Sequence, residues 1–147
     1  LVGGFHPPTT VVVDPMFLET LSPSALSAGF AEAAKIAFCR GDQAFQGYLE
    51  RFERFETDPA DLLLHVLEAK RWFVEIDEHD QKERRLLNFG HTFGHALESA
   101  VGHRVSHGVA VAVGMLCAIA HPASTDTPSV KQLEAQLMMR NYEGFIR

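Results

Sequence analysis

The chain has 147 residues, of which 46% are hydrophobic and 22% charged, a composition typical of a globular domain with a core rather than of a disordered segment. Its 13 Lys and Arg residues are outnumbered by 19 Asp and Glu residues, giving a net charge of −6 with His neutral. This balance argues against a nucleic-acid binder, which needs a basic surface. The longest apolar run, residues 109–120, is too short to span a bilayer, so we expect neither nucleic acid nor membrane as a partner.

The N-terminal region predicts one short β-strand. Residues 9–13 form a β-branched run that ends at Asp14-Pro15. A single strand is not stable alone, and no second strand is obvious in this sequence. We therefore expect residues 1–22 to be an interdomain strand and linker that belong to a larger sheet upstream.

The rest of the chain, residues 23–147, predicts a mainly α domain. Helices are expected over 24–39, 42–55, 58–76, 84–98 and 107–120, with a modest last helix over 130–139. Gly41 predicts the end of the first helix, and Asp58 followed by Pro59 predicts the start of the third. The inward side of the third helix is predicted to carry Leu62, Leu63, Val66, Leu67, Phe73 and Ile76. The 107–120 helix is apolar nearly all round, which predicts burial.

The two cysteines are far apart in the sequence and lie in apolar helical contexts. We expect Cys39 and Cys117 to be buried thiols in a reducing compartment, in keeping with a cytoplasmic protein.

The central stretch, residues 84–98, carries an unusual polar stripe on its predicted helix. At steps of three or four residues it places Arg84, Asn88, His91, His95 and Glu98. Gly90 and Gly94 each precede a histidine, and glycine in a helix interior costs roughly 1 kcal/mol relative to alanine. The glycine pair predicts that another backbone, an ion or a ligand approaches this helix closely.

Four of the eight histidines lie between positions 91 and 107, which favours a metal or catalytic site over solvent-facing rings. His91 and His95 are spaced to share one ligand, and His103 and His107 follow. His107 begins the last long helix, where the helix dipole favours the neutral ring that a metal ligand needs. Glu32 with His91 and His107 would make a Glu-His-His set of the catalytic zinc type, but spacing alone does not show that they converge.

Two lysines have ordinary interpretations on spacing alone. Lys35 stands three residues after Glu32, a spacing typical of a surface ion pair, although its apolar neighbours also allow a buried functional pair. Lys70, on the third predicted helix, is interpreted as a solvated residue.

Three motifs resemble the 3-dehydroquinate synthase family: GFAEAAK at 29–35, RRLLNFGHTFGHALE at 84–98 and HGVAVAVGM at 107–115. GGFHPPTTVVVD at 3–14 resembles the segment that joins that family's two domains. The resemblance covers roughly residues 1–120. It implies a lyase of the shikimate pathway that turns 3-deoxy-arabino-heptulosonate 7-phosphate into 3-dehydroquinate and phosphate. It also implies zinc or another divalent metal in a helical domain, and NAD in a separate N-terminal domain that this chain does not contain.

The resemblance implies roles for particular residues. Glu32, His91 and His107 would be the metal ligands. His95 would relay protons near the phosphate, helped by Asn88. Arg84 and Lys70 would hold the substrate carboxylate, and Lys35 would contact the substrate hydroxyls. No residue of this chain is assigned to NAD, and we expect the chain alone not to turn over.

The sequence also departs from the family pattern. Val109 replaces the usual glutamate after His-Gly, residues 121–129 do not look like the family, and a further substrate lysine near the family's end has no counterpart that we can place. Two alternatives therefore stay open. One is a related cyclase acting on sedoheptulose 7-phosphate or glucose 6-phosphate. The other is a non-catalytic zinc-binding or assembly module. We further expect self-association or a partner chain that supplies the NAD domain.

Overall fold

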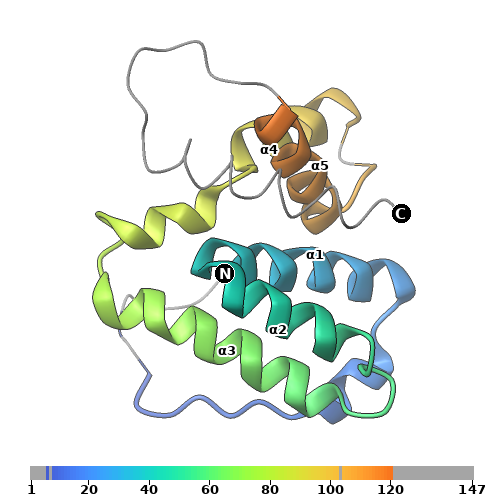
Figure 1. Ribbon diagram of the computed structural model, residues 1–147. Helices are drawn as coiled ribbons and strands as arrows, with labels where there is room; N and C mark the ends of the chain where they lie inside the picture. Colours follow the sequence, from blue (N-terminus) through green and yellow to red (C-terminus); the bar gives the residue numbers. More distant parts are fainter. Residues whose placement is uncertain (1–5, 7, 103, 121–147) are drawn as a thin grey trace.

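The computed structural model describes residue 6 and residues 8–102 and 104–120 (Figure 1). Every regular element within them is a helix, in agreement with the predicted mainly α domain. The elements are the 3-10 helix η1 (Pro15–Thr20), α1 (Pro23–Arg40), α2 (Asp42–Phe52), α3 (Pro59–Ile76), the 3-10 helix η2 (Glu83–Asn88), α4 (His91–Ala100) and α5 (His107–Ala120). None of these helices is long and apolar enough to cross a membrane. The predicted helix over 130–139 lies outside the described residues.

Local capping chemistry sets the ends of the two longest helices. The Ser22 side chain accepts a hydrogen bond from the N–H of Ala25 at 3.2 Å, and α1 ends at Gly41, whose φ is 122°. Asp58 caps α3 in the same way, accepting from the N–H of Asp61 at 3.2 Å. Both helices have proline in their first turn. The predicted starts and ends of these helices are confirmed to within one residue.

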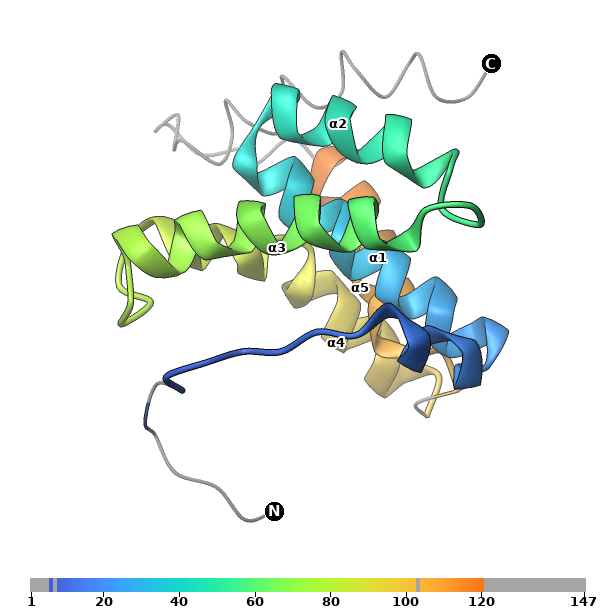
Figure 2. The same ribbon diagram turned by 90° about the horizontal axis from the view of Figure 1, so that it is seen from below.

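Helix α1 is the central element of the fold. It contacts α2 and α3 on one side and α5 on the other, and α4 packs against α5 (Figures 1 and 2). The core between α1, α2 and α3 is built on the buried residues Ala37, Tyr48 and Leu62. The Tyr48 hydroxyl donates a hydrogen bond to the carbonyl of Phe30 at 3.1 Å. This core holds α1 in place, so that its opposite side can carry functional groups toward α4 and α5.

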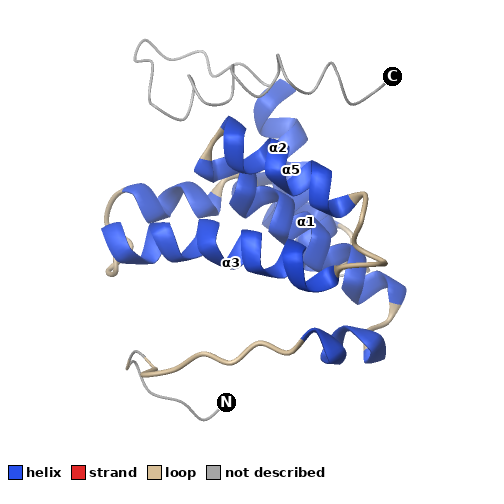
Figure 3. Ribbon diagram, turned by 60° about the horizontal axis from the view of Figure 1, so that its bottom comes forward, coloured by secondary structure: helices blue, strands red, loops and turns tan. Residues whose placement is uncertain are grey.

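The strand predicted over residues 9–13 is not formed. These residues are loop (Figure 3), and the side chains of Val11, Val12 and Val13 are 70%, 86% and 46% exposed. A strand needs a neighbour to satisfy its backbone groups, and the part of the chain that the structure describes contains no other strand.

The single helix predicted over residues 84–98 is also wrong. It is two helices, η2 and α4, separated at Gly90, which has a φ of 80°. A side chain at Gly90 would lie 2.7 Å from the Val111 carbonyl oxygen, so this backbone conformation and its contact with α5 both require glycine. The predicted polar stripe is broken as a result, and Arg84 and Asn88 do not share a helix face with His91.

Close approach of another backbone at the glycine pair is confirmed. A Cβ at Gly94 would lie 3.1 Å from the Ala110 carbonyl oxygen and from Cα of Val111. On the other side of this contact, Gly114 of α5 has no room for a side chain because the Gly90 carbonyl and the Gly94 N–H lie against it. Helices α4 and α5 therefore form an antiparallel hairpin with almost no space between their backbones.

Burial of α5 on all sides is not what the structure shows. Gly108, Ala110, Val111 and Gly114 are buried, but Val113 and Leu116 are about 40% exposed because, among the described elements, the helices packed on α5 are α4 and α1. Two residues predicted to face inward on α3, Leu67 and Ile76, are likewise exposed. Cys117 is exposed too, whereas Cys39 is half-buried and its thiol donates to the Leu86 carbonyl at 3.2 Å.

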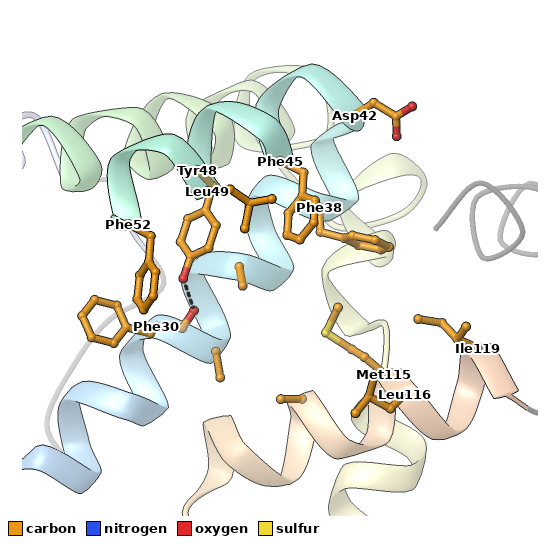
Figure 4. Close-up of a pocket in the computed structure, with 13 residues that line it drawn as sticks. Phe30, Phe38, Asp42, Phe45, Tyr48, Leu49, Phe52, Met115, Leu116 and Ile119 are labelled. Atoms are coloured by element: carbon orange, nitrogen blue, oxygen red, sulfur yellow. Dashed lines mark hydrogen bonds between the residues drawn. The ribbon is translucent and has the colours of Figure 1, made fainter. Parts of the chain in front are cut away.

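An apolar cavity of about 350 Å³ separates part of α5 from α1 and α2 (Figure 4). Aromatic rings of α1 and α2, among them Phe38 and Phe45, line one side of it. Met115, Leu116 and Ile119 of α5 line the other. Its lining is nearly all hydrocarbon, so it is not a site for polar chemistry.

Candidate metal centre

Three histidines meet where the α4–α5 hairpin packs on α1. His91 is the first residue of α4, His95 lies one turn later, and His107 is the first residue of α5. One nitrogen from each ring lies within 4.8 Å of the others, and the ring centroids are 5.3 to 5.6 Å apart. The tight packing through the glycines produces this convergence, because it brings the start of α5 close to α4.

A carboxylate from α1 lies against the same cluster. Glu32 Oε2 forms an ion pair with Lys35 Nζ at 2.7 Å, and the Lys35 side chain is only 5% exposed. The other oxygen, Oε1, is buried, makes no hydrogen bond to any described residue, and lies 4.0 Å from His107 Nε2. The predicted ion pair is thus partly buried, on the Lys35 side, and it leaves one carboxylate oxygen near His107.

This donor set fits a divalent metal such as zinc. A buried carboxylate oxygen without a partner costs free energy, and a cation beside Glu32 Oε1 would remove that cost. Carboxylate and imidazole are both common zinc ligands. The structure brings together the three predicted ligands, Glu32, His91 and His107, and it adds His95 as a third imidazole in reach of the same point.

The electrostatics of the cluster favour a neutral His91. Burial is the main cause that lowers the pKa of its ring, and the positive charge of Lys35 lowers it further. The Phe89 carbonyl and the Glu32 carboxylate act in the opposite direction without reversing the shift. Because a metal ligand must be neutral imidazole, the lowered pKa keeps His91 available for coordination.

Glu98 is a member of the cluster to which the sequence analysis assigned no role. Its carboxylate oxygens lie 3.2 and 3.3 Å from His107 Nδ1, and its side chain is 14% exposed. The sequence feature that pointed to Glu98 was its position in the predicted polar stripe, three residues after His95 and seven after His91.

The predicted substrate-binding residues outside the cluster are exposed or bound elsewhere. Lys70 is exposed and has no hydrogen-bond or ion-pair partner among the described residues. Arg84 donates to the Glu78 carbonyl at 2.8 Å. Asn88 is exposed at the end of η2. In the described part of the chain, no hydrogen bond or ion pair joins these three residues to the histidines, and His103 lies outside that part.

The position of Arg84 depends on Asp77, to which no role was assigned from the sequence. The Asp77 carboxylate accepts hydrogen bonds from the N–H groups of Gln81, Lys82 and Arg84 at 2.9, 2.7 and 3.1 Å. These bonds, the one from Gln81 most of all, hold the pKa of Asp77 below its ordinary value of 3.8. Asp77 therefore fixes the loop that leads into η2.

Comparison with known proteins agrees with this architecture. The family described as "3-dehydroquinate synthase C-terminal" matches residues 29–143. The chain is 45% identical over 130 residues to the 3-dehydroquinate synthase of Paracoccus denitrificans, covering 84% of this chain and 35% of that protein. It is 45% identical over 124 residues to the enzyme of Rhodopseudomonas palustris, covering 80% and 32%.

A more distant relative matches over a longer range. The chain is 38% identical over 143 residues to the 3-dehydroquinate synthase of Lactiplantibacillus plantarum, covering 94% of this chain and 40% of that protein. The chain thus spans about a third of the length of the relatives it matches. The resemblance seen in its three motifs is confirmed, and the chain belongs to the 3-dehydroquinate synthase family.

Proposed function

We propose that this chain is the metal-holding and substrate-holding helical part of an enzyme that converts 3-deoxy-arabino-heptulosonate 7-phosphate into 3-dehydroquinate and phosphate. One observation carries the proposal. The buried Glu32 Oε1 has no hydrogen-bond partner in the described part of the chain and lies 4.0 Å from His107 Nε2, beside a cluster of three imidazoles. Family membership supports the reaction class.

In this proposal Glu32, His91 and His107 hold zinc or another divalent cation. The metal, when bound, supplies Lewis-acid polarisation of an oxygen atom of the substrate. Lys35 occupies Glu32 Oε2, and this leaves Oε1 as the oxygen directed toward the cation. The lowered pKa of His91 keeps its ring neutral and able to donate a lone pair.

The remaining side chains bind the sugar phosphate and move protons. His95 is exposed beside His91 and His107, a suitable place for a proton relay near the phosphate, with Asn88 assisting. Lys70 and Arg84 hold the substrate carboxylate, and Lys35 contacts the substrate hydroxyls. These roles follow from matching motif positions, and each needs the substrate to bridge between η2, α3 and the histidine cluster.

The hydride carrier is outside this chain in the proposal. NAD is expected in the part of the relatives that the chain does not match, since the chain spans about a third of their length. Residues 1–22 would be the linker to that part, and residues 23–147 the helical domain. Exposed apolar side chains such as Val12 and Phe17 are suited to packing against that part, a second copy or a partner chain. The isolated chain is therefore expected to be inactive, because a hydride cannot move without its carrier.

The test is the zinc content of the purified chain, measured by elemental analysis. The expected result is one zinc per chain, lost in His91→Ala. A matched control is His79→Ala, because His79 is exposed in the loop before η2 and its loss should leave the zinc in place. A folded wild-type chain without zinc would overturn the metal assignment.

A second test separates a catalytic domain from a non-catalytic module. The zinc-loaded chain is mixed with the separately produced N-terminal region of the Paracoccus denitrificans relative, NAD and substrate, and phosphate release is followed. Activity that depends on both parts supports the proposal. Zinc binding without activity on mixing would favour a zinc-binding or assembly module. Turnover of sedoheptulose 7-phosphate instead would favour a related cyclase.

A further inference from the structure

His107 lies between two carboxylates that come from different helices. Its Nδ1 is 3.2 and 3.3 Å from the oxygens of Glu98 on α4. Its Nε2 is 4.0 Å from Glu32 Oε1 on α1. One ring therefore contacts the α4 carboxylate at hydrogen-bond distance and also lies near the α1 carboxylate oxygen, which has no hydrogen bond among the described residues.

The chemistry of these groups determines where the His107 proton resides. A carboxylate only accepts hydrogen bonds, so the bond to Glu98 requires the proton on Nδ1. In the neutral ring, the lone pair then lies on Nε2, the nitrogen that is 4.0 Å from Glu32 Oε1. Two lone-pair donors thus face each other, an arrangement that a cation between them would stabilise.

We propose that Glu98 is a positioning residue, which fixes the orientation and the Nδ1–H tautomer of His107 so that Nε2 points into the metal centre. The inference rests on the proposed function, because it assigns a role to Glu98 within that same site. Glu98 itself contacts the far side of the ring rather than the cation. Its side chain is 14% exposed, against 48% for His107, so the more buried partner orients the more exposed one.

The position of Glu98 along α4 is consistent with this role. It lies seven residues, or about two turns, after His91 and three after His95, so one helix face carries all three side chains. Gly94 of the same helix packs closely against Ala110 of α5. This contact sets which residues of α4 lie opposite which residues of α5. A change in that register would separate Glu98 from His107 and disturb the site without touching any ligand.

The first experiment reads the tautomer directly and needs no metal. The complete 147-residue chain is labelled with nitrogen-15, and long-range proton–nitrogen spectra of the metal-free protein are recorded, with His107→Gln identifying the His107 signals. The expected result is an Nδ1–H tautomer in the wild type and a shift toward Nε2–H, the form that free histidine prefers, in Glu98→Ala. An Nε2–H tautomer in the wild type would overturn the proposal.

The second experiment measures the dissociation constant for zinc by competition with a coloured chelator. Glu98→Ala should weaken binding by about 10- to 100-fold, the usual effect of losing such a partner. Glu98→Gln keeps a carbonyl oxygen that can accept from Nδ1 and should weaken binding less than about tenfold. Equal losses in both variants would show that only the charge of Glu98 matters, and would overturn the positioning role.

Two controls keep the outcomes separate. Ser99→Ala, which changes an exposed neighbour on α4, should alter neither the tautomer nor the affinity. Thermal unfolding of each metal-free variant, followed by circular dichroism, reports any loss of the helices themselves. If the wild-type chain binds no zinc, the proposed function fails, while the tautomer spectra still decide whether Glu98 orients His107.

Discussion

The two ends of the contact between α1 and α5 are built from opposite kinds of residues. At one end Gly108 packs so closely on the backbone of Ala28 that a side chain there would collide with the Ala28 carbonyl. Glu32 and His107 lie at this end. At the other end large side chains such as Phe38 and Met115 keep the helices apart and leave the apolar cavity of about 350 Å³ (Figure 4).

The difference shows how small residues produce a polar site inside a helical domain. Side chains as short as glutamate and histidine can share one ligand only if their backbones are close, and Gly108 allows that approach. Where the side chains are long and apolar, the helices lie further apart and their side chains make fewer van der Waals contacts with each other. Substitutions at either end of this contact test the difference.

The largest effect is expected from Gly108→Ala. The added methyl group meets backbone atoms of Ala28, which cannot move aside as a flexible side chain can. We expect a loss of about 3 kcal/mol in the free energy of unfolding, measured by urea denaturation, together with weaker zinc binding because Glu32 and His107 move apart. Unchanged stability and affinity would contradict the close packing at this end.

The next largest effects are expected from leucine substitutions at two alanines of α5. Ala112 lines the cavity, so Ala112→Leu should fill space and stabilise the chain by about 1 to 2 kcal/mol. Ala110 is fully buried against Gly94, so Ala110→Leu should destabilise it by about 1 to 3 kcal/mol. Urea denaturation of both variants measures the change in the free energy of unfolding. If Ala112→Leu destabilises the chain as Ala110→Leu does, the cavity cannot accommodate the larger side chain.

A smaller effect is expected from Tyr48, which lines the cavity on the α2 side. Tyr48→Phe removes the hydrogen bond to Phe30 and should cost about 1 kcal/mol at pH 8. Burial raises the pKa of the Tyr48 hydroxyl from 10.0 to about 12. The neutral form is therefore favoured in the folded state, and this stabilisation is complete below pH 10 and is lost as the pH rises from 10 toward 12.

Urea denaturation between pH 8 and pH 11.5 measures this dependence. The wild type should lose stability more steeply than Tyr48→Phe above pH 10. Parallel curves would mean that the hydroxyl is accessible to water in the folded chain.

The smallest effect is expected from Gly29→Ala, the matched control for Gly108. Gly29 is inside α1, and a Cβ there would have no neighbour within 4 Å. The substitution should stabilise the chain by about 0.5 to 1 kcal/mol through helix propensity and should leave zinc binding unchanged. Destabilisation would show that this face of α1 is covered in solution.

Much of the fold was predictable because it depends on local chemistry. The starts of α1 and α3 follow from Ser22 and Asp58, whose side chains cap the N–H groups three residues later. The break at Gly90 was not predictable from periodicity, because its φ of 80° and its contact with α5 arise only in the folded chain. Exposed residues on α3 and α5, such as Leu67 and Leu116, were predicted as buried because an apolar pattern does not reveal how many neighbours a helix has.

The candidate site was likewise predictable from the sequence only in part. Residue types and spacing indicated His91 and His95 on one helix and a Glu-His-His set of Glu32, His91 and His107, and the family motifs implied that this set holds the metal. The contact of Glu98 with His107 and the place of His95 as a third imidazole were visible only in three dimensions.

The sequence by itself therefore determined most of the helices, the caps of α1 and α3, the family and the kinds of side chain at the site, since these depend on neighbours within a few residues. Only the tertiary structure decided which of those side chains meet. Groups on separate helices come within a few ångströms of each other only when the backbones pack closely, and the contacts of Gly90, Gly94 and Gly108 with residues distant in the sequence set that packing.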